Sequence, residues 1–333
     1  MGGNDVDTPQ QRPSELPESG TRRGRFSALA RPISALAHWA GWPKVASVAT
    51  AVAAVAALFF SAQSLRATRD QSALSEQGLV TERLAKAIEL IASDNIEVRT
   101  GGLYLLQRLA NDSPTDRSTV LQVLAAYLHN HSPATSCPPE APDVPDGSYL
   151  GELVRRPLDI QAAAAAVGQF ASREKLTAHY TYDLSNLCLA GVRWTQAQLS
   201  GVNLDGSNLM GADISSADLS KASLSGANLF DVNALRANFT SAGLANCDFS
   251  DANLLNTDFT DARLARANLS GADLGSSTLT RAKLNGATLS GADLGSDELT
   301  DADLTDATLT NAQLDGVRYG PGTKWPSGFA PPR

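Results

Sequence analysis

The feature that most constrains this chain is an apolar residue at every fifth position from Leu199 to Leu314, without an insertion or a deletion in that stretch. Of these 24 positions, 23 hold Leu, Ile or Phe and one holds Ala. The residue two places earlier is Ala in 17 of the 24 units. An α-helix repeats its faces every 3.6 residues and a β-strand every two, so neither produces this period. The backbone must therefore turn a corner once in each unit.

Four corners close a square coil, so four successive units make one coil. Such coils stack as a solenoid whose backbone groups pair at about the strand spacing of 4.7–4.9 Å. The large residue of each unit points at the axis, and the small residue before it points inward where neighbouring sides crowd it. The expected core includes Leu199, Leu204, Leu209, Ile214, Leu219, Phe239, Phe249, Phe259, Leu274 and Leu294.

Units such as Ala212-Asp213-Ile214 and Ala272-Asp273-Leu274 resemble the A-(D/N)-L-x-x signature of the pentapeptide-repeat family. The resemblance implies a right-handed quadrilateral β-helix, here of about seven coils. Weaker units extend it back to Leu184 and forward to Tyr319. The closing stretch of the repeats also resembles the way in which family members end, which implies that Trp325 caps the last coil.

Composition shifts along the chain predict a mainly β protein in which a membrane helix and a small all-α segment precede the solenoid. The predicted parts are a disordered basic tail (1–44), a transmembrane helix (45–65), a helical domain (66–131), a linker (132–157), a capping helix and junction (158–180), the β-helix (181–319) and a C-terminal cap or tail (320–333).

The transmembrane prediction comes from a stretch without charged residues, which runs from Val45 to Leu65. As a helix it would span about 31 Å, which matches a hydrocarbon core of roughly 30 Å. A buried core helix and a cleaved signal peptide are the alternatives; a core helix is rarely apolar all round over this length, and Phe60 suits a cleavage site poorly. A single-pass protein of the cell membrane is therefore expected. The Lys and Arg counts on the two sides are too even to decide which side carries the repeats.

Motifs that carry chemistry are missing from the sequence. It contains no phosphate-binding loop, no H-E-x-x-H and no Cys-x-x-Cys, and all four histidines precede the repeats. Cys137, Cys188 and Cys247 are too few and too scattered for a disulfide framework or a zinc cluster. The sequence predicts no catalytic residue, no cofactor and no metal. An enzyme built around the junction at Tyr180, Tyr182 and Trp194 has no base or cofactor motif to support it.

Charge is the one signal on the predicted surface. Between Thr181 and Tyr319 there are 17 acidic and 8 basic residues, a net charge of −9. Residues 20 apart, one coil on, should lie above one another, which places Asp273 over Asp293. The candidate acidic interaction face consists of Asp273, Asp293, Asp297, Glu298, Asp301, Asp303 and Asp306. Its alternative interpretation is that exposed Asp only keeps the repeats soluble.

These observations predict a membrane-anchored scaffold without enzymatic activity, whose rod presents flat faces to an unknown protein partner. Homo-oligomerisation stays open, and no nucleic acid partner is expected. The alternative is an acidic mimic of DNA that binds and protects or inhibits gyrase, because some proteins of the resembling family act in this way. Seven coils would carry about one net charge per 3.7 Å, whereas duplex DNA carries one per about 1.7 Å, so the match is poor.

Overall fold

The computed structural model describes residues 60–61, 63–64, 78–137, 156–171 and 182–332. The predicted basic tail (1–44) lies outside the described residues, and so does nearly all of the predicted membrane helix (45–65). Among the residues that are described, no helix is both long and apolar enough to cross a bilayer. The chain divides into two units, residues 1–74 and residues 75–333, and the second unit holds the features described below.

The second unit begins with helices. Residues 78–91 are helical, and they are followed by α3 (Ile96–Asp112), α4 (Arg117–His131), the 3-10 helix η1 (Ala134–Ser136) and α6 (Leu158–Phe170). α3 begins at Asn95, whose side-chain oxygen accepts hydrogen bonds from the free amides of the first turn, at 2.8 Å from Glu97 N. Such caps favour a helix start at that residue.

Gly102 lets the helix of residues 78–91 approach α3 closely. A Cβ atom at this position would lie 2.9 Å from Leu90 Cβ and 2.9 Å from Ile91 Cγ2. Leu103 and Leu106 follow on α3 and are fully buried. The three helices α3, α4 and α6 all contact one another, so the helical residues form one packed layer.

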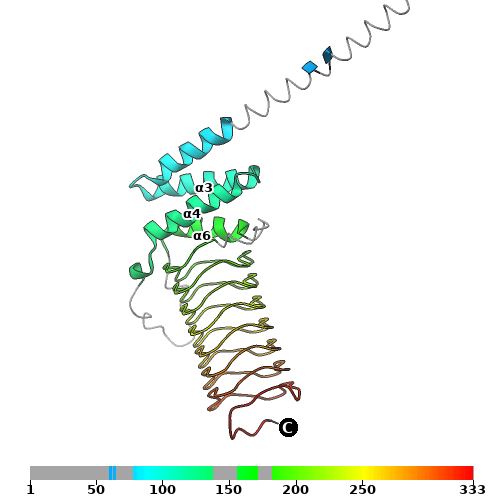
Figure 1. Ribbon diagram of the computed structural model, residues 1–333. Helices are drawn as coiled ribbons and strands as arrows, with labels where there is room; N and C mark the ends of the chain where they lie inside the picture. The colour runs from blue at the N-terminus through cyan, green and yellow to red at the C-terminus, as the bar shows by residue number, and fades with distance from the viewer. Residues whose placement is uncertain (1–59, 62, 65–77, 138–155, 172–181, 333) are drawn as a thin grey trace, which may run out of the picture. The chain divides into compact units, whose positions relative to one another are not determined.

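The repeats form a β-helix, as predicted. Parallel bridges join residues 20 apart along four columns, which begin with Asp183↔Asn203, Cys188↔Asn208, Arg193↔Asp213 and Gln198↔Asp218. Four columns correspond to four sides of a coil. Figure 1 shows these coils stacked one on another from the green residues after α6 to the red C-terminus. From Asn203 on, each bridged residue donates its amide to the coil before, as Asp213 N does to Val192 O at 2.9 Å.

The corners explain the chemistry of the signature. One residue in every five has a positive φ, which glycine adopts without strain and Asn, Asp and Ser tolerate in short turns. The Asp or Asn before each core residue accepts a hydrogen bond from the amide two residues on, as Asp218 Oδ1 does from Ser220 N at 3.0 Å. A carboxylate or amide side chain at this position therefore stabilises the turn by itself.

The interior is a column of Leu and Phe side chains. The core residues predicted from the sequence are all at most 1% exposed. Three of them form an aromatic cluster: Phe239 stacks on Phe259 at 5.2 Å, and Phe249 meets both rings edge-on. Aromatic pairs in these geometries add to the free energy gained from burial alone.

The C-terminal end departs from the register of the coils. Asp303 bridges to Lys324 instead of Thr323, whereas every earlier bridge along the coils joins residues 20 apart. Trp325 is half-buried against the core, with the ring of Tyr319 at 5.3 Å and the ring of Phe329 at 5.4 Å. These rings cover part of the last coil, at the place where the sequence predicted a Trp325 cap.

Candidate functional site: the solenoid surface and its helical cap

We call the helix of residues 78–91 together with α3, α4 and α6 the helical cap. Within it, α6 covers the first coil through buried polar contacts. Trp194 is 2% exposed and donates its indole N–H to Ala164 O at 2.6 Å. Gln198 N donates to Gly168 O, also at 2.6 Å, which satisfies backbone groups that an uncovered coil end would expose to solvent. The side chain of Trp194 is therefore a structural contact between cap and coil, and it is not available at a surface cleft.

A charged network holds α6 to the other helices. Asp159, in the first turn of α6, is 2% exposed; its Oδ2 accepts from Tyr127 Oη at 2.7 Å and from Arg99 Nε at 2.8 Å. Burial alone would raise the pKa of Asp159, but these hydrogen bonds outweigh it, so the pKa lies below its usual value. Burial and the bond to Asp159 raise the pKa of Tyr127. This network could not be predicted from the sequence, because its three members lie far apart in the chain and follow no motif.

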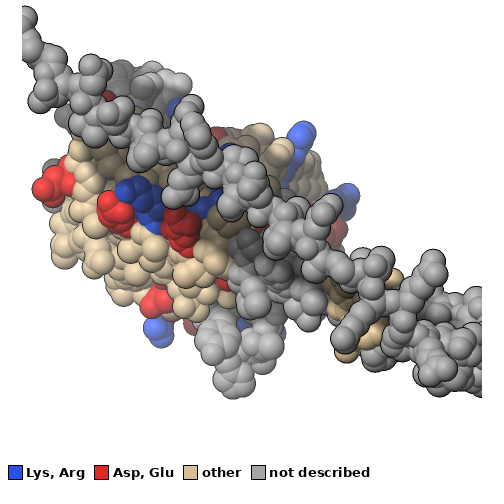
Figure 2. All heavy atoms as spheres, turned by 90° about the horizontal axis from the view of Figure 1, so that it is seen from above, with Lys and Arg blue, Asp and Glu red and all other residues tan. Residues whose placement is uncertain are grey.

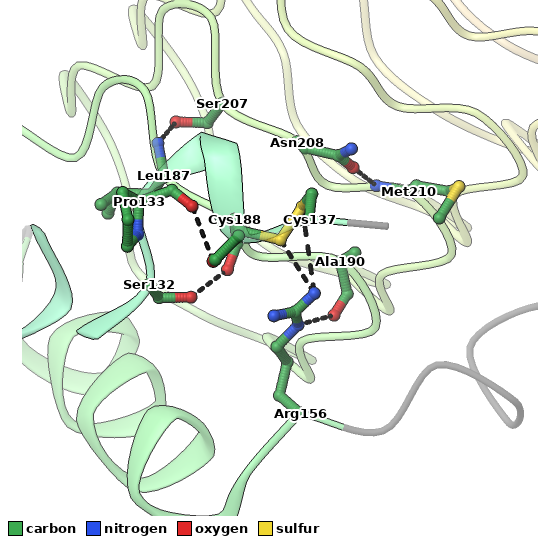
Figure 3. Close-up of a disulfide and its surroundings, with 11 residues drawn as sticks. Ser132, Pro133, Cys137, Arg156, Leu187, Cys188, Ala190, Ser207, Asn208 and Met210 are labelled. Carbon is green, nitrogen blue, oxygen red and sulfur yellow. Dashed lines mark hydrogen bonds between the residues drawn. A yellow bond between two sulfur atoms is a disulfide. The ribbon is translucent and has the colours of Figure 1, made fainter. Parts of the chain in front are cut away.

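A disulfide fastens the segment after α4 to the first coil. Cys137 is bonded to Cys188, with 5.3 Å between their Cα atoms (Figure 3). Pro133 forms an antiparallel bridge with Leu187, and Ser132 Oγ donates to Cys188 O. These contacts hold the segment after α4 beside the first coil and bring the two sulfur atoms together. The expectation that the cysteines are too scattered for a disulfide is wrong for this pair. A separation of 51 residues gave no local signal, because the pairing depends on how α4 returns to the coil.

Arg156 lies against this disulfide. Its guanidinium donates to Ala190 O at 3.0 Å and points at Cys188 Sγ at 2.8 Å (Figure 3). Burial lowers the pKa of Arg156. The prediction of a linker at 132–157 is therefore wrong for residues 132–137 and Arg156, which pack against the first coil; residues 138–155 lie outside the described residues.

The seven residues of the predicted acidic face do not share one face. Asp273 and Asp293 lie above one another, as expected. Glu298 belongs to the next side, where it pairs with Arg318 at 3.2 Å, and Asp303 lies on a further side, paired with Lys324 at 3.1 Å. Each five-residue step carries the chain to another side, so acids that are close in sequence become separated around the coil. Asp301 and Asp306 are exposed at two different corners.

Asp297 is not at the surface. It occupies the inward position that Ala holds in most units, and it is fully buried. Its Oδ1 accepts from Ser277 N at 2.7 Å, while Oδ2 has no hydrogen-bond partner among the described residues. Burial raises the pKa of Asp297 to about 8. The remaining polar residues in such positions, among them Ser277, bond back to a carbonyl of the preceding coil.

In the described part of the chain, no cluster of three or more His, Cys, Asp or Glu is placed to hold a metal ion. His129 and His131 each direct Nδ1 at a carbonyl of their own helix. Cys247 is buried, and burial raises the pKa of its thiol to about 12. Seen from above, Lys and Arg side chains lie beside Asp and Glu side chains (Figure 2).

A family model described as pentapeptide repeats matches in eight copies, at residues 183–215, 207–244, 217–256, 242–281, 257–296 and 279–318. The solenoid is a pentapeptide-repeat domain. The match covers the pentapeptide-repeat domain and leaves the helical cap outside it. No curated protein matches the chain.

Solved structures with this repeat are similar to parts of the chain. One is HetL, a pentapeptide repeat protein involved in heterocyst differentiation regulation from the cyanobacterium Nostoc sp. strain PCC 7120, with 27% identity over 41% of this chain and 73% of that chain and a TM-score of 0.33. Another comes from the thylakoid lumen of Arabidopsis thaliana, with 29% identity over 32% and 67% of the chains and a TM-score of 0.17. QnrB1, a plasmid-mediated fluoroquinolone resistance protein, is 24% identical over 40% and 90%, with a TM-score of 0.26.

Proposed function

We propose that this protein is a membrane-anchored scaffold without enzymatic activity, in which the pentapeptide-repeat domain binds a protein partner. The observation that carries the proposal is that the described pentapeptide-repeat domain has a covered first coil, a buried core and a mostly polar surface. Its first coil is covered by α6, its core residues are buried, and most of its outward positions carry polar or charged side chains. A rigid surface of this kind loses little conformational entropy when a partner binds.

The anchor in this proposal is the apolar stretch Val45 to Leu65, whose length suits a bilayer. Cell fractionation tests it. The full chain should sediment with membranes and resist extraction by alkaline carbonate, and a variant that lacks residues 45–65 should be released into the soluble fraction. If the shortened variant stays with the membranes, residues 45–65 are not the anchor.

We propose further that the pentapeptide-repeat domain lies in an oxidising compartment, outside the cytosol. Disulfides persist in such compartments and are rare in reducing ones. The Cys137–Cys188 bond supports a location of the pentapeptide-repeat domain on the side of the membrane away from the cytosol, a choice that the Lys and Arg counts left undecided. Thiol trapping in intact cells tests it: Cys137 and Cys188 should be protected from a maleimide until a reductant is added. Both thiols reacting after denaturation without reductant would place the domain in a reducing compartment.

Gyrase inhibition by mimicry of DNA gains no support from the arrangement of charge. Three of the acidic residues on the described surface are neutralised by bases one coil away: Asp261 by Arg281, Glu298 by Arg318 and Asp303 by Lys324. An oxidising compartment would also separate the domain from the chromosome. A supercoiling assay with the purified protein distinguishes the two functions, since a scaffold leaves gyrase activity unchanged and a mimic inhibits it.

A further inference from the structure

Four of the eight basic residues between Thr181 and Tyr319 are grouped in the short stretch from Arg263 to Lys283. The β-helix brings them to one side of two successive coils. Arg263 and Lys283 bridge one another in the same outward column. Arg281 lies at the corner before that column, and Arg266 lies at the corner after it. We call Arg263, Arg266 and Lys283 the cationic patch.

The stacking of Arg263 on Lys283 is unfavourable for Arg263 in the free protein, because its neighbours in the column are Gly243 and Lys283, whereas Lys283 also faces Asp303 in the next coil. Like charges directly opposite one another on paired strands destabilise a sheet. In other columns, side chains stacked 20 residues apart form hydrogen bonds, as where Asn268 Nδ2 donates to Asp248 Oδ1 at 2.9 Å. Arg281 is matched by a bidentate pair with Asp261, with both N···O distances at 2.7 Å. The three members of the cationic patch form no ion pair with another described residue, and all three are exposed.

The neighbouring coils limit what can bind here. In the coil before the patch, the corresponding positions hold the uncharged Ser241, Gly243 and Asn246. In the coil after it, they hold Asp301, Asp303 and Asp306. The basic surface is therefore two coils high, about 10 Å at the strand spacing. A duplex nucleic acid carries one charge per about 1.7 Å and would extend over the acidic coil, where it is repelled.

We propose that the cationic patch docks a short acidic segment of a protein partner, with carboxylates on Arg263 and Lys283 and with Arg266 at the edge. Guanidinium groups bind carboxylates in bidentate geometry. The coil of Asp301, Asp303 and Asp306 favours a segment in which the acidic residues are followed by basic ones. Gly243 carries no side chain, so the backbone of the partner can approach the coil above the patch. This inference rests on the proposed scaffold function and names the chemistry of its partner.

Fluorescence anisotropy with the full chain in detergent tests the proposal. The probe is a labelled peptide of four glutamates followed by three lysines, at low ionic strength. The patch variant combines Arg263→Ser, Arg266→Ser and Lys283→Thr. A control variant removes the same number of exposed bases elsewhere, by Arg193→Ser, Lys221→Ser and Arg236→Ser. We expect the patch variant to bind the peptide about tenfold more weakly, because it loses three exposed ion pairs that each contribute only a little to the binding free energy. The control variant keeps these pairs, so its affinity should change by less than twofold.

Equal weakening by both triple variants would show that only net charge matters and would overturn the proposal. So would a single-stranded oligonucleotide of 20 thymidines that binds the wild type as tightly as the peptide and loses the same factor in the patch variant. Either result leaves the anchor and the scaffold function intact, since fractionation and the supercoiling assay test those separately.

A second measurement does not need the peptide. Arg263→Thr alone removes the like-charge stack and leaves Lys283 facing Asp303, so it should raise the melting temperature of the free protein at low salt, and the gain should disappear at 1 M salt because screening removes the repulsion. Lys221→Ser, which removes a base from a different coil that has no basic residue stacked on it, should not do so. A lower melting temperature for Arg263→Thr would contradict the premise that the stack is unfavourable.

Discussion

Asp297 is a carboxyl group placed among Leu and Ala side chains. The positions directly above it in the preceding coils hold Ser277 and Thr257, whose hydroxyls each donate to a backbone carbonyl of the coil before, at 2.7 and 3.0 Å. A neutral carboxyl group can act in the same way, whereas an ionised one leaves a buried charge. The nearby acids Asp293 and Asp273 add to the effect of burial and raise the pKa further.

Replacing Asp297 by Ser should stabilise the protein in mildly alkaline solution. The carboxyl has a folded pKa of about 8, above its ordinary value of 3.8, so the folded state holds a proton that the unfolded state has lost. The stability that this group contributes is complete below about pH 4 and declines up to about pH 8, by about 1.4 kcal/mol per pH unit. Asp297→Ser removes this decline and keeps the hydrogen bond.

Thermal unfolding from pH 5 to pH 9 checks this expectation. The difference in melting temperature between Asp297→Ser and the wild type should grow in favour of the variant as the pH rises, and it should level off near pH 8. Asp251→Ser is the matched control, because Asp251 is exposed at a corner where Ser also occurs in other coils. A parallel pH profile for Asp297→Ser and the wild type would contradict a raised pKa.

At the scale of single elements, α6 packs closely on the first coil because residue 168 is a glycine. An ideal Cβ on Gly168 would lie 2.9 Å from Trp194 Cδ1 and 3.0 Å from Ala197 Cβ, and both neighbours are buried. On α3, a Cβ on Gly101 would meet nothing within 4 Å. Both glycines are helical, so replacing them by Ala improves helix propensity by the same amount.

The two alanine variants should therefore change stability in opposite directions. Gly101→Ala should raise the free energy of unfolding by about 0.5–1 kcal/mol, from helix propensity alone. Gly168→Ala should lower it by about 1–3 kcal/mol, because the new methyl group pushes α6 away from the first coil. Urea unfolding followed by Trp fluorescence measures both. If Gly168→Ala is as stabilising as Gly101→Ala, the close fit between α6 and the coil is wrong.

The sequence predicted the regular elements better than the contacts between them. The period of five predicted the coil, the columns and the burial of residues such as Phe249, because each of these follows from local spacing. The same period places Asp297 at an inward position, two residues before Leu299, and its assignment to the acidic face was wrong because that assignment followed the charge of the residue and not the register. The Cys137–Cys188 bond and the Asp159 network also escaped it, because they join segments whose meeting depends on tertiary packing.

At the scale of the whole molecule, the helical cap and the pentapeptide-repeat domain are joined by noncovalent and covalent links. α6 contributes backbone and side-chain hydrogen bonds to the first coil. The disulfide adds a covalent connection between two positions 51 residues apart in the chain. Closing a loop of this length in the unfolded chain corresponds to about 4 kcal/mol in the chain-entropy model.

Cys137→Ser should consequently lower the melting temperature and make it insensitive to reductant. The wild type should fall to the value of the variant when dithiothreitol is added, since both then lack the bond. Differential scanning calorimetry with and without dithiothreitol measures this. Cys247→Ser is the control for the loss of a thiol, because Cys247 is free and buried. A wild type whose melting temperature ignores the reductant would show that the bond does not form in solution.

The regular register of the bridges also limits how such a chain can change its length. Loss of a full coil would shorten the rod and leave every later side chain on its original side. Loss of one five-residue unit would preserve the leucine column and yet rotate everything downstream by a quarter turn. The same core could thereby present a new sequence of charges to its surroundings, which offers a route to altered specificity that needs no substitution.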